Sequence, residues 1–222
     1  MPNADDPVLY DYWRSSACYR VRIALNLKGQ RYVQKPVHLV RDGGEQHSAE
    51  HRARNPQEAV PVLVDRGRTI TQSLAIIEYL EETRGGDAPR LLPADPAARA
   101  RVRALALAVA CDVHPLNNLR VMQQLERAFG AAQADRERWM RHWIDEGFRA
   151  LETMLASSPD TGAYCHGDAP TLADACLIPQ VYNANRFGVS LEAYPTIRRI
   201  NERCLAHPAF DAARPENQPD AA

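Results

Sequence analysis

The hydrophobic pattern changes its period at Ser16. Residues 8–13, VLYDYW, are apolar, aromatic and β-branched, as is typical of a strand. From Ser16 onward apolar residues recur at helical spacing, and Gly29 is placed to follow the end of that helix. Residues 31–40 return to a strand-like composition. This order predicts a β-α-β unit whose two strands run parallel.

A second group of elements follows a polar stretch. Residues 43–56 read as a short polar helix or an ordered loop. AVPVLVD and then RTI predict two strands close enough in sequence to pair as an antiparallel hairpin. Residues 71–83 predict a helix with Ser73 as its N-cap, and its packed face is supplied by Leu74, Ile77, Tyr79 and Leu80.

The rest of the chain has helical periodicity. Residues 87–96 are rich in proline and form the predicted linker. Beyond it come long Ala/Leu/Arg-rich segments, with an interruption at His114–Pro115, and a polar tail after Pro208 that we expect to be frayed. The predicted organisation is an α/β domain over residues 1–86, the linker, and an all-helical domain over residues 97–222.

Composition narrows the function classes. The chain is 45% hydrophobic and 25% charged with a formal net charge of −1, which argues against a nucleic-acid or membrane-surface partner. Its five cysteines are scattered, without CxxC or metal-ligand spacing, and no signal-peptide or membrane-spanning pattern is visible. We therefore expect a cytoplasmic protein with reduced thiols and no metal site.

The sequence RSSAC stands where the first strand gives way to the first helix. A helix N-terminus presents unpaired N–H groups and a partial positive charge, so it binds anions and favours ionised thiols. The hydroxyls of Ser15 and Ser16 would add hydrogen-bond donors for a thiolate. The plain alternative is that one serine only caps the helix.

Two more features of the first predicted domain indicate that it binds a ligand. A cis Val60–Pro61 bond would turn backbone groups of Val60 toward a ligand, although most X–Pro bonds are trans. Gln72 and Ser73 at the start of the next helix offer a second anion site, for example for a carboxylate. Taken singly, each serine or glutamine could be an ordinary helix-capping residue. The combination of two polar helix N-termini and a Val-Pro pair in one small domain is what indicates a binding site.

That combination resembles the thioredoxin-like domain of glutathione transferases, and the zeta class in particular. The similarity is carried by RSSACYRVRIALNLKG, NPQEAVPVLVD, QSLAIIEYLEETR and GDAPTLADACLIPQVYNANRF, and it extends from about Val8 to about Pro219. The resemblance implies the two-domain glutathione transferase fold, glutathione as cofactor, and a homodimer in which the first domain packs against the partner's helices.

The resemblance also implies residue roles. Ser15 or Ser16 would hold the glutathione thiolate, Gln72 and Ser73 the γ-glutamyl end, and Val60 with Pro61 the cysteinyl backbone. The family carries a cysteine where this chain has Ala17, with Cys18 one residue later, which counts against a covalent role for a protein thiol. Thr171 and Asp174 have capping-box spacing, and we assign Asp174 to folding.

The implied reaction is glutathione-dependent cis–trans isomerisation of maleylacetoacetate to fumarylacetoacetate. Such a diacid needs cationic clamps, and an arginine fork suits a carboxylate. Arg14 beside the serines and Arg186 in NANRF are the candidates, against the alternative that Arg186 is a surface residue. His114 and Asn118, at the helix interruption, are candidate contacts to glutathione, and His114 is also a candidate contact to the substrate. The alternative is that His114 has only a structural role.

Several readings stay open. Sequences similar to CDVHPLNN include maleylpyruvate isomerases of the same class, so maleylpyruvate is an alternative substrate. A glutathione-dependent redox enzyme would need a reactive cysteine at the first helix. A non-catalytic glutathione-binding module would fit if the arginines are only surface charge. A general transferase acting on halogenated acids or similar electrophiles is a further alternative.

Overall fold

A computed structural model describes residues 6–86 and 88–221. Its internal contacts divide the chain into two compact units. The first unit contains the chain up to Leu91 together with the residues from His207 onward, and the helical unit is Leu92–Ala206. The predicted second domain ran to residue 222, whereas the segment after His207 belongs to the first unit.

The first unit is built on a four-stranded mixed sheet. Its strands are β1 (Val8–Asp11), β2 (Val33–Pro36), β3 (Val62–Asp65) and β4 (Arg68–Thr71). They lie in the order β2-β1-β3-β4, with β1 parallel to β2 and antiparallel to β3, and β3 antiparallel to β4. The expected parallel β-α-β unit and antiparallel hairpin are both confirmed.

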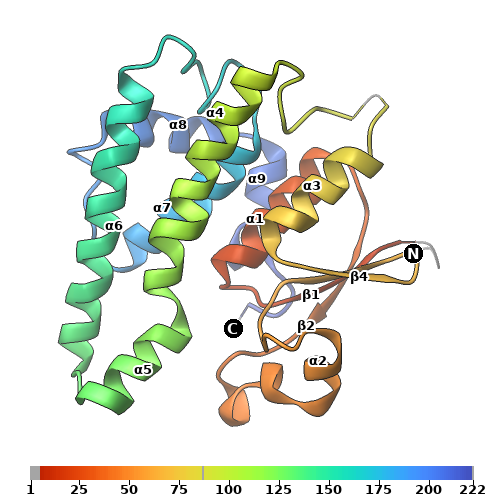
Figure 1. Cartoon of the computed structure of the whole chain (residues 1–222), viewed down its shortest axis with the longest axis vertical. Coiled ribbons are helices and arrows are strands. Elements are labelled where there is room, and N and C mark those ends of the chain that lie inside the picture. Colours follow the sequence, from red (N-terminus) through yellow and green to blue (C-terminus); the bar gives the residue numbers. More distant parts are fainter. Residues whose placement is uncertain (1–5, 87, 222) are drawn as a thin grey trace. The chain divides into compact units, whose positions relative to one another are not determined.

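Helices α1 (Ser16–Leu27) and α3 (Ser73–Thr83) pack side by side in the first unit (Figure 1). Gly29 follows the C-cap of α1 with φ +61°, the left-handed conformation that glycine adopts at low cost. The polar stretch after β2 forms two 3₁₀ turns and a short helix: η1 (Arg41–Gly43), η2 (Glu45–His47) and α2 (Ala49–Arg54).

The start of α3 differs from the prediction. The N-cap is Gln72, in an unusual conformation with φ +69° and ψ +117°, and Ser73 is the first helical residue. The Ser73 hydroxyl does not cap its own helix; it accepts a hydrogen bond from Arg20 of α1. The predicted N-cap role of Ser73 is therefore wrong, because its oxygen serves a partner from the neighbouring helix.

The C-terminal segment, residues 207–221, is ordered rather than frayed. It forms α9 (Pro208–Ala212) and the 3₁₀ turn η5 (Pro215–Asn217), and α9 packs against α1. Phe210 is fully buried, and Asn26 of α1 donates to the Ala209 carbonyl over 3.0 Å. The buried Phe210 side chain and the hydrogen bond from the Asn26 side chain thus help to hold this segment on α1.

The helical unit contains the remaining elements. They are α4 (Pro96–Leu107), the π-helical turn η3 (Ala108–Val113), the 3₁₀ turn η4 (His114–Asn117), α5 (Leu119–Phe129), α6 (Gln133–Ala156), α7 (Leu172–Arg186) and α8 (Pro195–Leu205). Helix α7 packs against α4 (Figure 1). The predicted break before Pro115 is confirmed, and it is a π turn followed by a 3₁₀ turn rather than a simple kink.

The capping box at α7 is present as predicted. The buried Asp174 carboxylate accepts hydrogen bonds from the Thr171 N–H, the Thr171 hydroxyl and the Cys165 N–H, each at 2.8 Å. Burial raises the pKa of Asp174, and these hydrogen bonds oppose the rise. Asp174 thereby joins the preceding loop to a helix that is buried along most of its length.

Candidate functional site

The sheet register brings three predicted binding segments to one edge of the first unit. Tyr10 of β1 pairs with Val62 of β3, and Val62 pairs with Thr71 of β4. Antiparallel pairing therefore places the end of β1 beside the start of β3, which in turn lies beside the end of β4. The residues that continue these strands are the loop 12–16, the Val60–Pro61 pair and the Gln72–Ser73 pair.

The loop of residues 12–16, here called the serine loop, presents both serines at the mouth of α1. Ser15 is the N-cap, and its Oγ accepts from the Cys18 N–H over 3.3 Å. The Ser15 N–H in turn donates to the Tyr12 carbonyl over 3.0 Å, which closes the loop into a turn. Ser16 is the first helical residue, and both serines are half-buried. The cap alternative is thus true of Ser15, whose hydroxyl hydrogen is still able to donate.

Arg14 lies in the same loop and is also half-buried. Its guanidinium stacks over the Trp13 ring at 5.0 Å from the ring centre, and Nη2 lies 3.5 Å from the Tyr12 hydroxyl. The second contact is at the limit of a hydrogen bond, so it restrains the guanidinium only weakly. Arg14 therefore stands beside the serines with donors suited to a carboxylate.

The Val60–Pro61 peptide bond is cis. Pro61 is buried and Val60 is half-buried. The carbonyl immediately before them, that of Ala59, accepts hydrogen bonds from Asn55 Nδ2 at 2.8 Å and from His51 Nε2 at 3.0 Å. Because a carbonyl only accepts, His51 carries its proton on Nε2 in this contact. The backbone directly before Val60 is consequently fixed by two buried side chains, those of His51 and Asn55.

The mouth of α3 combines a helix N-terminus with a buried cation. Arg20 is 2% exposed, and its Nη1 donates to Ser73 Oγ over 3.3 Å. Gln72 is exposed, and its Nε2 donates to Gln57 Oε1 over 2.7 Å. The helix dipole and the guanidinium both contribute positive potential at the same point, which suits a carboxylate ligand.

Cys18 is the third residue of α1 and is fully buried. Burial raises the pKa of its thiol well above the usual value, and the nearby Asp11 carboxylate adds to the rise. A thiol in this state is neither accessible nor ionised at neutral pH, so Cys18 is unsuited to redox or covalent chemistry.

The other predicted contacts belong to the helical unit. His114 begins the 3₁₀ turn η4, and Asn118 follows that turn as the N-cap of α5, where its Oδ1 accepts from the Arg120 N–H over 3.2 Å. Arg186 is the last residue of α7, exposed, with its guanidinium 5.0 Å from the centre of the Phe187 ring. His114 and Asn118 thus bracket one turn, and Arg186 ends a different helix.

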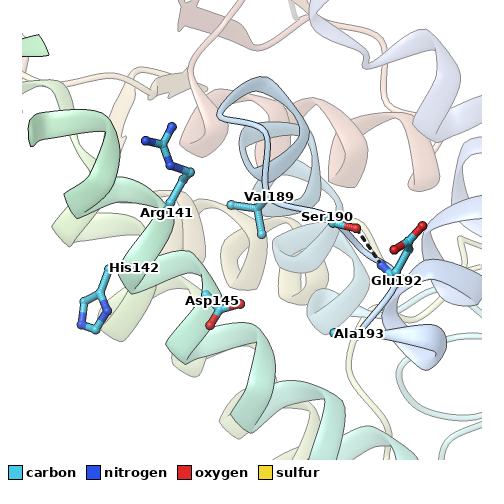
Figure 2. A pocket seen from close by; sticks show the side chains of 7 residues that line it. All are labelled: Arg141, His142, Asp145, Val189, Ser190, Glu192 and Ala193. Carbon is cyan, nitrogen blue, oxygen red and sulfur yellow. Dashed lines mark hydrogen bonds between the residues drawn. The ribbon is translucent and has the colours of Figure 1, made fainter. Parts of the chain in front are cut away.

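A hollow of about 510 Å³ in the helical unit is lined by other residues (Figure 2). They are Arg141, His142 and Asp145 of α6 and Val189, Ser190, Glu192 and Ala193 of the loop that follows α7. The Asp145 carboxylate is occupied by the Tyr194 hydroxyl and by Arg149, and Ser190 Oγ accepts from the Glu192 N–H over 3.2 Å. None of the predicted site residues lines this hollow.

Three buried or bridging side chains at the site were not predicted. Arg20 contacts Ser73, Arg22 contacts the serine loop, and Gln57 contacts Gln72. The available signal was the pair of arginines within CYRVRIAL, since a charged residue on a helix surrounded by apolar positions has to find a buried partner. Across residues 6–86 and 88–221 no cluster of three or more His, Cys, Asp or Glu suits a metal ion, and no helix there is long and apolar enough to cross a membrane.

Comparison with known families agrees with this geometry. Residues 9–88 match the model of the glutathione S-transferase N-terminal domain, and residues 96–207 match that of the C-terminal domain. The chain belongs to the glutathione S-transferase family. Within that family it is of the zeta-class type, as its similarity to a bacterial zeta-class structure shows.

Individual relatives are similar over nearly their full length. A probable maleylacetoacetate isomerase of Vibrio cholerae is 54% identical, over 96% of this chain and 98% of that protein. The holo structure of a bacterial zeta-class maleylpyruvate isomerase is 48% identical with a TM-score of 0.92, over 97% of this chain and 100% of that one. A maleylacetoacetate isomerase from Methylobacterium extorquens AM1 with bound malonate and glutathione is 46% identical with a TM-score of 0.92, over 97% of this chain and 99% of that one.

Proposed function

We propose that this protein is a glutathione-dependent cis–trans isomerase that converts maleylacetoacetate to fumarylacetoacetate, a step in aromatic amino acid catabolism. The observation that carries the proposal is the convergence of the serine loop, Val60–Pro61 and the mouth of α3 at one edge of the sheet. The similarity to isomerases of this type over nearly the whole chain supports it.

The residues at this edge fit glutathione. The tripeptide has a free α-carboxylate on its γ-glutamyl end, and Ser73 with Arg20 beneath it forms a positively polarised mouth for such a group. Gln72 would hold the same end, and Val60 has backbone groups to pair with the cysteinyl residue. When bound, glutathione supplies the nucleophilic sulfur that the reaction requires.

The residues of the chain itself prepare that sulfur and orient the substrate. The N-terminus of α1 and the hydroxyls of Ser15 and Ser16 favour an ionised thiol. The helix N-terminus supplies positive potential near the thiolate, and the hydroxyls donate hydrogen bonds to it. Arg14 would hold a substrate carboxylate beside the serines. Arg186 and His114 of the helical unit are further proposed substrate contacts, and His114 and Asn118 proposed contacts to glutathione. Catalysis in this arrangement is positioning and charge stabilisation.

Two substitutions and two substrates test the proposal. The protein is incubated with glutathione and either maleylacetoacetate or maleylpyruvate, and loss of the enol absorbance is followed. Ser15→Ala and Ser16→Ala are then compared, and loss of the true thiolate donor should lower the rate roughly 10²–10³-fold, as for one stabilising donor. Unchanged rates in both variants would refute the thiolate role.

Maleylpyruvate isomerisation is the second candidate. It is favoured by the 48% identity and TM-score of 0.92 to a solved maleylpyruvate isomerase. Maleylpyruvate is a shorter diacid that needs the same chemistry, so the ratio of kcat/KM for the two substrates decides between the two. General glutathione transferase activity toward other electrophiles is compatible with the same site. A redox role is disfavoured by the burial of Cys18.

Assembly and location are part of the proposal. We expect a homodimer located in the cytoplasm. Sedimentation equilibrium gives the mass directly, and 24.8 kDa per chain predicts a species of twice that mass. A monomer at micromolar concentration would contradict the dimer, and fractionation of cells would test the location.

A further inference from the structure

The guanidinium of Arg22 is the centre of a hydrogen-bonded cluster inside the first unit. Arg22 is fully buried, and its Nη1 lies 2.8 Å and 3.0 Å from the two oxygens of the buried Asp11 carboxylate. Its Nη2 donates to the Trp13 carbonyl over 2.8 Å, and its Nε donates to the Ala213 carbonyl over 3.0 Å. One side chain of α1 thus joins the end of β1, the serine loop and the C-terminal segment.

The Trp13 residue of the serine loop is held on both of its peptide groups. Arg22 holds its carbonyl, and its N–H donates to Asp220 Oδ2 over 3.1 Å. Two residues later, the Ser15 N–H is fixed on the Tyr12 carbonyl. The backbone that carries Ser15 and Ser16 is therefore restrained directly before the serines. The two hydrogen bonds on Trp13 involve a guanidinium and a carboxylate, and such charge-assisted bonds are the stronger kind.

The C-terminal segment that supplies Asp220 is itself anchored to the sheet. Gln34 of β2 donates to Asp11 Oδ2 at 2.8 Å and to Gln218 Oε1 at 2.9 Å. The Gln218 side chain is buried and donates to the carbonyls of Ala212 and Arg214, which fixes the turn before Asp220. The Asp220 carboxylate is consequently placed beside the Trp13 N–H by an ordered turn.

We propose that Arg22 and Asp220 are positioning residues for the serine loop, so that the C-terminal segment sets where the Ser15 and Ser16 hydroxyls stand relative to the sulfur of bound glutathione. The inference rests on the proposed function, because it assigns the serines to that sulfur. Its physical basis is that hydroxyl donors stabilise a charge only at hydrogen-bond distance, and a misplacement of about 1 Å is enough to lose most of that effect.

The test uses Asp220, because Arg22 is fully buried and its replacement endangers folding. Asp220→Ala removes the acceptor of the Trp13 N–H, and Asp220→Asn keeps an amide oxygen in its place. Asn26→Ala is the matched control: it removes the hydrogen bond from α1 to Ala209, so it loosens the same C-terminal segment without touching the serine loop.

Three measurements separate positioning from general loosening. Hydrogen exchange in the absence of glutathione should show faster exchange at residues 13–16 in Asp220→Ala than in Asn26→Ala. The ultraviolet absorbance of the glutathione thiolate, per molecule bound at neutral pH, should fall about threefold to tenfold in Asp220→Ala and recover in Asp220→Asn, as for a partly lost donor. Affinity for S-methylglutathione, which has no ionisable thiol, should change less than twofold by comparison.

Equal behaviour of Asp220→Ala and Asn26→Ala, or a wild-type exchange pattern at residues 13–16 in Asp220→Ala, would overturn the positioning role. Failure of the proposed function looks different, since the unaltered protein would then show no glutathione-dependent isomerisation, even where it binds glutathione. The exchange measurement needs no glutathione, so it still decides whether Asp220 restrains the loop.

Discussion

Arg20 of α1 donates through Nη1 to Ser73 Oγ at the start of α3, over 3.3 Å, and this contact joins the two helices whose N-termini face the proposed glutathione site. Because the Ser73 oxygen accepts from Arg20, its own hydrogen is directed toward another acceptor. A ligand carboxylate would meet a donor and, behind it, a buried positive charge. The buried Arg20 guanidinium therefore adds positive potential to the proposed γ-glutamyl site before any ligand binds.

Replacing Arg20 by Gln should weaken glutathione binding about tenfold, as expected for loss of a hydrogen bond that involves a charged group. The value of kcat at saturating glutathione should change little, because Arg20 supports the end of the tripeptide remote from its sulfur. Titration calorimetry measures the affinity. In a double-mutant cycle with Ser73→Ala the two effects should be strongly non-additive; simple additivity would show that Arg20 acts independently of Ser73.

The two serines should differ in their contribution to stability. Ser15 is the N-cap of α1 and accepts from the Cys18 N–H, so Ser15→Ala should lower the free energy of unfolding by about 1 kcal/mol. Ser16 is the first helical residue, and Ser16→Ala should be close to neutral. Urea unfolding at equal protein concentration measures both. A larger loss for Ser16→Ala than for Ser15→Ala would contradict the assignment of the cap.

The local pattern was sufficient for most of the first unit. The change of period at Ser16 and the glycine at position 29 fix the ends of α1, and the order of the elements predicted the parallel pair and the antiparallel hairpin. The pairing of β1 with β3 was not predicted. The pattern was insufficient for the C-terminal segment. Its polar composition predicts fraying, but its order depends on contacts with α1 and β2, which are remote in sequence.

The candidate site likewise contains residues that could be predicted from the sequence and residues that could not. Ser15, Gln72 and Ser73 were predictable candidates, because the residues that begin helices have recognisable types. Its supporting members were not, since nothing in the sequence tells which buried atom Arg20 or Arg22 contacts. The φ of +69° at Gln72 was also unpredictable, and it moved the cap one residue from its expected place.

Asp174 should be essential for stability and dispensable for chemistry. Asp174→Ala leaves the Thr171 N–H, the Thr171 hydroxyl and the Cys165 N–H without their acceptor. We expect a loss of about 3 kcal/mol or more in the free energy of unfolding, because buried unsatisfied donors are costly. The rate per folded molecule should stay within about twofold of the original, since a residue outside the site gives no transition-state contact. A folded variant without activity would refute this assignment.

The pair of Tyr194 and Asp145 should make stability depend on pH in the acid range. The Tyr194 hydroxyl, followed by Arg149, lowers the pKa of Asp145, and burial raises the pKa of Tyr194 to about 12, so that tyrosine remains a donor. A lowered carboxyl pKa stabilises the fold above the unfolded-state pKa, and the effect is lost as pH falls through the folded-state pKa. Tyr194→Phe should therefore be destabilising at pH 7, and this destabilisation should shrink at acid pH. Unfolding midpoints across the range test this, and a pH-independent difference would contradict it.

Thiol reactivity should be confined to Cys111. It is exposed, whereas the other four cysteines are buried, and burial raises the pKa of Cys18, Cys165 and Cys204. A disulfide reagent at neutral pH should titrate one thiol per native chain and five after denaturation. In Cys111→Ser the native titre should vanish with isomerase activity retained. Rapid native reaction of Cys18 would reopen the redox alternative.

Arg22 and Ala213 are 191 positions apart, yet they share a hydrogen bond in the first unit. A ribosome must therefore release the whole intervening helical unit before the guanidinium of Arg22 meets that carbonyl. Until then the emerging N-terminal half carries a cation without one of its final acceptors, and its sheet lacks Gln218 beside Gln34. Translation of this protein thus completes its first compact unit after its second.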